Sequence, residues 1–168
     1  MEDLRKIYKL QYQEKCSKYP DISKKDVLPA VERIIVIGDL HGDWNETIKS
    51  LKIGKVINDN LEWIGGKTVV VQIGDQIDRC RELPCNRPIG NDENSDIKIL
   101  EFFTKLHSQA LEKGGAIYSI IGNHELMNAT GRTEYVSYKN YMGFENDSNN
   151  KKFLKNMPKE LKNMDARK

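Results

Sequence analysis

Three apolar runs in this chain end in the same way, with a glycine followed by polar residues. They read RIIVIGD at 33–39, VVVQIGD at 69–75 and AIYSIIGN at 116–123. A continuous apolar run closed by a turn signal is typical of a buried strand. Helix-like patterns over about 44–52 and 96–113 separate the three runs. This alternation predicts an α/β unit with a mainly parallel, buried sheet.

The remaining segments predict a single domain with additions at each end. At 168 residues the chain is long enough for one core. We expect an N-terminal helix (3–19) and connector within 1–30, the domain over 31–145, and a basic polar tail over 146–168. Asp43 is a suitable cap for the first internal helix and Gly54 its stop. Ser95 or Asp96 begins the second helix, which Gly114 ends. No structure is predicted for 140–168.

Composition excludes several classes of partner. The net charge is only +2, which gives no global argument for nucleic-acid or membrane binding. The sequence contains neither a membrane-spanning apolar window nor the apolar core of a signal peptide. Three cysteines, an odd number, favour a reducing intracellular setting, and we expect a cytoplasmic protein. Cys80 and Cys85 could pair or bind metal, but free thiols in a loop are favoured.

The polar ends of the three runs are expected to converge. They read GDLHGD (38–43), GDQIDR (74–79) and GNHE (122–125). The carboxyl ends of parallel strands face one crevice, and the glycines allow each chain to turn sharply there. Three adjacent strands would therefore bring together Asp39, His41, Asp75, Asp78, Arg79, Asn123 and His124.

These residue types point to metal and phosphate chemistry. Carboxylate, imidazole and amide donors without thiolate suit Mn, Fe, Zn or Ni. Asp75, on the middle motif, can bridge two cations through its two oxygens. Two such cations would activate a water molecule and clamp phosphoryl oxygens. Arg79 can bind phosphate oxygens in a two-pronged way. His124 can protonate the leaving alkoxide, with Asp78 holding its imidazole in the right tautomer.

The three motifs together resemble the calcineurin-like metallophosphoesterase superfamily. They are most similar to its phosphoprotein phosphatase branch, where the forms are GDxHG, GDxxDR and GNHE. The following ELMNATGRTEYVS is similar to the continuation in Shewanella-like phosphatases. The resemblance covers about 33–140 and implies an α+β domain: a mixed-sheet β-sandwich flanked by helices. It also implies a phosphoric monoester hydrolase acting on Ser/Thr phosphoproteins.

The resemblance also implies roles for individual residues. Asp39, His41 and Asp75 would hold a first divalent metal ion, and Asp75 with Asn123 would begin the second. Asn123 is also expected to contact the phosphate. The roles that it implies for the remaining residues agree with the chemical interpretation: His124 as general acid, Asp78 as its support and Arg79 on the phosphate.

The sequence departs from the family pattern in its histidines. The family completes its second metal site with histidines further along the chain, but this chain has only three histidines. His41 and His124 are already assigned, and His107 lies mid-helix, where packing is favoured. We therefore expect the N-terminal half of a phosphatase domain, with an incomplete second metal site. We also expect exposed apolar surface where the second sheet of the sandwich should lie.

Three functions remain open at this stage. The first is the metal-dependent phosphatase, with a phosphoprotein as the main substrate and a diadenosine-tetraphosphatase-like activity as an alternative. The second is a weak or inactive fragment that serves as a metal- or phosphate-binding module. The third is an assembly in which a second chain supplies the missing strands and histidines.

Overall fold

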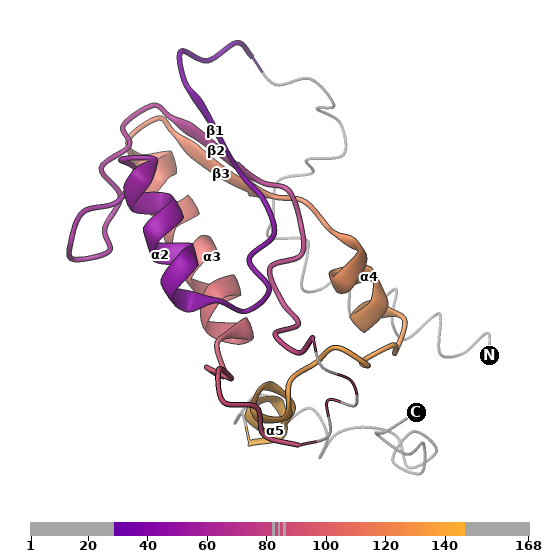
Figure 1. Cartoon of the computed structure of the whole chain (residues 1–168). Helices are drawn as coiled ribbons and strands as arrows, with labels where there is room; N and C mark the ends of the chain where they lie inside the picture. Colours follow the sequence, from indigo (N-terminus) through magenta and orange to yellow (C-terminus); the bar gives the residue numbers. More distant parts are fainter. Residues whose placement is uncertain (1–28, 82, 84, 86, 147–168) are drawn as a thin grey trace. The chain divides into compact units, whose positions relative to one another are not determined.

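The computed structural model describes residues 29–146 apart from 82, 84 and 86 (Figure 1). The helix predicted for 3–19 and nearly all of the basic tail predicted for 146–168 lie outside the described residues. Within them, no helix is both long and apolar enough to cross a membrane.

The three apolar runs form one parallel sheet. The strands are β1 (Ile34–Ile37), β2 (Val69–Gln72) and β3 (Ala116–Ser119), in the order β1-β2-β3. Val71 of β2 lies opposite Val36 on one side and Tyr118 on the other. The predicted strand–helix–strand unit with a parallel sheet is therefore confirmed. The second sheet that the resemblance implied does not occur in the described part of the chain.

Two helices cover one face of this sheet. They are α2 (Trp44–Ile53) and α3 (Asp96–Glu112), and they lie side by side against the strands in Figure 1. The core forms between the helices and the sheet. Its fully buried members include Leu51 of α2, Ile99 and Leu106 of α3, and Val70 of β2. Because strand side chains alternate between faces, only every second residue of each strand joins this core.

The opposite face of the sheet is partly open, which corrects one prediction. β1 was expected to be a buried strand, but Ile34 is 59% exposed and Val36 is 61% exposed. Ile73 and Ile120, just beyond β2 and β3, are exposed as well. The reason is that α2 and α3 lie on the same face, so a continuous apolar run need not mean two covered faces. The expected exposed apolar surface is present here.

The helix ends follow the predicted signals in part. The Asp43 carboxylate accepts a hydrogen bond from the Glu46 backbone N–H at 2.9 Å and caps α2, and Gly54 follows the helix. Ser95 precedes α3 without capping it by its side chain. Its hydroxyl instead donates to the Gly42 carbonyl, which ties the start of α3 to the loop after β1.

Two further helices follow β3: α4 (Asn123–Ala129) and α5 (Tyr138–Asn146). The prediction of no structure from residue 140 onward is therefore wrong for the part that α5 contains. A buried polar network holds α5 in place. Asn140 accepts from the Asp96 backbone N–H at 3.1 Å, and the Ser137 hydroxyl donates to Asp92 at 2.8 Å. Such tertiary contacts leave no periodic apolar signal in the sequence.

His107 packs within the fold, as predicted. It is half-buried on α3, and its Nδ1 accepts a hydrogen bond from the Ile117 backbone N–H at 3.2 Å. The ring also lies near Tyr118, with centroids 6.0 Å apart. The residue therefore joins α3 to β3.

The prediction of free thiols at residues 80 and 85 is wrong. Cys80 and Cys85 form a disulfide, and Cys80 is fully buried. Disulfides are typical of oxidising compartments. The cysteines therefore no longer support a reducing setting.

Candidate active site

Backbone hydrogen bonds join the loop after β1 to the loop after β2. The backbone N–H groups of Leu40 and His41 both donate to the Asp75 carbonyl at 2.9 Å. Gly42 donates in the same way to the Gln76 carbonyl at 2.8 Å. These bonds fix GDLHGD against GDQIDR, so the relative placement of the two motifs does not depend on their side chains.

The carboxylate of Glu125 joins the second loop to α4. It accepts from the backbone N–H groups of Asp75 at 2.8 Å, Gln76 at 2.7 Å and Gly122 at 2.7 Å. In addition, the His124 N–H donates to Asp75 Oδ1 at 2.9 Å. No role was predicted for Glu125. A Glu three residues after the N-cap of a helix is a capping-box signal. Glu125 has this spacing from Gly122, so the signal could have indicated its contact with the Gly122 N–H.

Gly74 is required where the second and third motifs meet. Its φ is +100°, and a Cβ at this position would lie 2.5 Å from the backbone of Gly122. The backbones of the two loops therefore approach too closely for any side chain at residue 74. Each motif glycine was expected to be needed for a sharp turn. Gly38 does not show this need sterically, because a Cβ there would meet nothing within 4 Å.

Several site residues have a left-handed backbone conformation. The φ angles are +45° for His41, +54° for Asp75 and +72° for Asp78. This conformation is uncommon for residues other than glycine and persists where the surrounding structure enforces it. Here the hydrogen bonds between the loops enforce it, and the side chains are thereby aimed across the ends of the strands.

The structure brings together a group of potential metal ligands. One ligand atom each from His41, Asp75 and His124 lies within 4.8 Å of the others. Asp39 adjoins this group, since its Oδ2 is 3.5 Å from His41 Nε2. Asp39 and His41 are 59% and 24% exposed at their side chains, whereas Asp75 is buried. The group is therefore accessible from the Asp39 side.

The donors of this group fit a divalent cation. His41 Nδ1 lies 3.2 Å from the Ile77 carbonyl, an acceptor, so that nitrogen carries the proton. Its Nε2, facing Asp39, is then free to donate a lone pair, which is the usual arrangement for a metal-binding histidine. Asp75 uses Oδ1 for the His124 N–H and has a second oxygen that can serve a cation.

His124 and Asp78 form a buried pair. His124 Nδ1 lies 2.7 Å from Asp78 Oδ2, and Asp78 is fully buried. Two other rings pack edge-on against His124: His41 at 4.8 Å and Tyr135 at 5.1 Å between centroids. The imidazole is therefore held on several sides, with Nε2 as the ring nitrogen that remains for chemistry.

Two predicted site residues are less closely joined to the group. Arg79 Nη1 donates to Asp43 Oδ2 at 2.7 Å, and Nε donates to the Asn91 carbonyl at 3.1 Å. Asn123 opens α4 directly before His124 and is exposed. Among the described residues, its side chain makes no hydrogen bond within the group.

Asp96 is a buried carboxyl group beneath the site. Burial raises its pKa to about 7, and the nearby charges of Asp78 and Asp92 act in the same direction against the opposing hydrogen bond from the Asp78 N–H. Asp96 Oδ2 accepts that bond at 3.2 Å, while Oδ1 is buried without a hydrogen-bond partner. Asp96 therefore contacts the backbone of Asp78, whose carboxylate pairs with His124.

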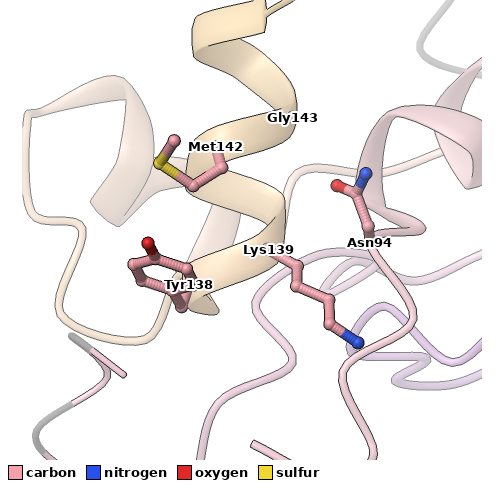
Figure 2. A pocket seen from close by; sticks show the side chains of 5 residues that line it. All are labelled: Asn94, Tyr138, Lys139, Met142 and Gly143. Atoms are coloured by element: carbon pink, nitrogen blue, oxygen red, sulfur yellow. The ribbon is translucent and has the colours of Figure 1, made fainter. Parts of the chain in front are cut away.

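A shallow pocket lies beside α5, away from the three motifs (Figure 2). It is lined by Asn94, Tyr138, Lys139, Met142 and Gly143. None of these residues belongs to the polar ends of the strands. The pocket therefore gives no support to the candidate site.

Two of the curated proteins similar to this chain are named as phosphatases. The chain is 40% identical over 114 residues to Shewanella-like protein phosphatase 2 of Arabidopsis thaliana, covering 68% of this chain and 26% of that protein. It is 36% identical over 118 residues to Shewanella-like protein phosphatase 1 of Plasmodium berghei, covering 70% and 29%. The chain thus spans between a quarter and a third of these relatives' length.

The fold agrees as well. A crystal structure of a cold-active protein-tyrosine phosphatase from a psychrophilic Shewanella species superposes with a TM-score of 0.58 at 25% identity. The match covers 77% of this chain and 37% of that one. The model of the calcineurin-like phosphoesterase family matches residues 32–165, which include all three motifs. The chain belongs to the calcineurin-like phosphoesterase family.

Proposed function

We propose that this chain carries the metal- and phosphate-binding part of a phosphoric monoester hydrolase that acts on phosphoproteins. The observation that supports this most is the joint placement of His41, Asp75 and His124 beside Asp39, with Asp78 behind His124. Family membership and the names of the relatives support the same reaction class.

In this proposal Asp39, His41 and Asp75 hold a first divalent cation. The second is expected at Asp75 and Asn123, with Asp75 shared. Bound cations would supply Lewis acidity, polarising a phosphoryl oxygen and lowering the pKa of a water molecule. The donor types indicate the group Mn, Fe, Zn and Ni and do not select one metal from it.

His124 acts as the general acid in this proposal. Asp78 accepts from Nδ1, so the acid is the doubly protonated imidazolium, and its Nε2–H proton is the one given to the leaving oxygen. His124 lies close enough to His41 and Asp75 to be a ligand instead. The contact with Asp78 fits either role, and we favour the acid role because the family resemblance implies it.

Arg79 is proposed to bind the phosphate. Asp43 and the Asn91 carbonyl occupy Nη1 and Nε, so Nη2 is the nitrogen that we assign to the phosphate. The ion pair with Asp43 would restrict the guanidinium to few orientations, which reduces the entropy lost on binding.

A second chain that completes the site is supported by the open face of the sheet. Ile34 and Val36 are more than half exposed there, and contiguous exposed apolar surface is typical of an interaction site. Such a chain would supply the strands and histidines that the family pattern includes. In that case the turnover per chain would rise with protein concentration.

Hydrolysis of p-nitrophenyl phosphate with added manganese tests the proposed reaction. We expect turnover by the wild type. With phenyl phosphate, whose leaving oxygen is more basic, we expect a loss on the order of 100-fold in His124→Asn. The His124→Asn variant should still bind the metal if His124 is the acid, and should lose metal binding if His124 is a ligand. Absence of turnover at any protein concentration would contradict the hydrolase and favour a binding module.

Phosphopeptides test the substrate class. The sequence favoured Ser/Thr phosphoproteins, whereas the similar Shewanella enzyme is named a protein-tyrosine phosphatase. Matched peptides that differ only in phosphoserine, phosphothreonine or phosphotyrosine separate the two. Phosphate release from none of them would contradict the assignment to phosphoproteins.

A further inference from the structure

Asn128 contacts both members of the His124–Asp78 pair. It lies four residues after His124 on α4, so the two side chains share one face of the helix. Its Nδ2 lies 2.9 Å from each carboxylate oxygen of Asp78 and 3.0 Å from the His124 carbonyl. A carboxylate and a carbonyl only accept, so the nitrogen end of the amide must face them.

Asp78 needs a partner of this kind because its carboxylate is fully buried. A buried carboxylate is costly unless hydrogen bonds satisfy its oxygens. Among the described residues, the ion pair of Asp78 is with His124, and no Lys or Arg side chain pairs with the carboxylate. The N–H donors of Asn128 and His124 therefore carry this task together.

We propose that Asn128 is a positioning residue for the reaction. Its amide contacts both oxygens of Asp78 and so fixes the plane of the carboxylate. The fixed carboxylate holds Nδ1 of His124, and the imidazole then presents Nε2 in one orientation. This role rests on the proposed function, in which His124 protonates the leaving group.

A purely structural role for Asn128 predicts different behaviour. Its bond to the His124 carbonyl also stabilises α4, and loss of that bond alone would affect every substrate equally. Proton donation matters chiefly when the leaving oxygen is strongly basic. A positioning role therefore predicts that the loss depends on the leaving group.

Asn128→Ala removes the donor and should not weaken α4 through helix propensity, because alanine has the highest helix propensity of all residues. The matched control is Asn45→Ala, because the Asn45 amide also donates to a carboxylate, that of Glu93 at 3.2 Å, outside the pair. With manganese added, we expect Asn128→Ala to reduce kcat for phenyl phosphate about 10-fold or more. For dinitrophenyl phosphate, whose leaving group needs no proton, we expect less than about a 2-fold change. Equal losses on both substrates would contradict the proposal.

A second measurement does not require turnover. The chain has only three histidines, so the ring nitrogens of ¹⁵N-histidine-labelled protein can be assigned by substitution. In metal-free wild type we expect His124 in the Nδ1–H tautomer, with its proton protected from exchange with water. Asn128→Ala should accelerate that exchange about 10-fold or more, and Asn45→Ala should not. An unchanged tautomer and exchange rate in Asn128→Ala would overturn the proposal, whether or not the chain hydrolyses phosphate.

Discussion

Arg79 Nη1 donates to Asp43 Oδ2 at 2.7 Å, which joins the end of the second motif to the end of the first. The same carboxylate caps α2 through the Glu46 N–H. Burial alone would raise the pKa of Asp43, but these hydrogen bonds and the charge of Arg79 lower it on balance. One carboxylate therefore serves a helix end and the proposed phosphate-binding residue.

Substitution of Asp43 can separate these two roles. Asp43→Ser keeps a good capping residue and removes the ion pair, whereas Asp43→Ala removes both. We expect the alanine variant to be about 1 kcal/mol less stable than the serine variant in urea unfolding. Equal stability of the two variants would show that the cap contributes nothing.

The lowered pKa of Asp43 gives a pH dependence with a definite sign. Because the folded value is below the ordinary 3.8, the ionised carboxylate stabilises the fold above that pH. This stabilisation is lost as the pH falls through the folded value. We expect the difference in unfolding free energy between wild type and Asp43→Ser to shrink below about pH 4. A difference that stays constant there would contradict the ion pair.

Glu125→Gln should destabilise the junction of the second motif with α4. The two carboxylate oxygens accept from three backbone N–H groups, and the amide of glutamine would place a donor against one or two of them. We expect a loss of about 1–3 kcal/mol in unfolding free energy. The control is Glu112→Gln at the exposed end of α3, which should change stability little. Similar effects of both substitutions would contradict this role of Glu125.

Asp96→Asn should stabilise the protein at neutral and higher pH. The pKa of Asp96 is raised from 3.8 to about 7, so its contribution to stability is fully present below pH 3.8 and is lost as the pH rises toward about 7. An asparagine avoids the cost of burying the charge while still accepting from the Asp78 N–H. We expect the variant to gain on wild type between about pH 4 and pH 8 in thermal unfolding. A gain that is equal at both ends of this range would contradict the raised pKa.

Cys85→Ser tests the disulfide. Three cysteines less the two in the bond leave one thiol, so the oxidised, denatured wild type should titrate one thiol, and three after reduction. For so short a loop we expect the substitution to cost about 2 kcal/mol. Reductant should destabilise the wild type and leave Cys85→Ser unchanged. Three thiols in the untreated protein would contradict the bond.

Sequence patterns predicted the elements whose signals are local. The apolar runs predicted the strands, and the caps at Asp43 and Gly54 marked α2. The polar residues at the ends of the three runs predicted that His41, Asp75 and His124 would meet, since parallel strands end at one edge.

Other features depend on contacts between distant segments and were not predicted. The capping-box spacing could have indicated the contact of Glu125 with Gly122, but no local pattern reveals the contacts of Glu125 and Asn128 with groups about 50 residues away. The exposure of Val36 depends on which face the helices cover, not on the apolar run itself. The Cys80–Cys85 bond required the loop geometry, because one pair of cysteines at this spacing is compatible with several states.

Manganese binding to wild type and Asp75→Asn, measured by calorimetry on chelator-treated protein, tests the central claim most directly. Asp75 lies in the second motif. Its backbone carbonyl accepts from the first motif and its buried carboxylate accepts from the third, and it is the proposed shared ligand. We predict saturable binding to the wild type, its loss in Asp75→Asn, and unchanged binding in Asp59→Asn, an exposed aspartate outside the motifs. Equal manganese binding by wild type and Asp75→Asn would contradict the proposed metal site.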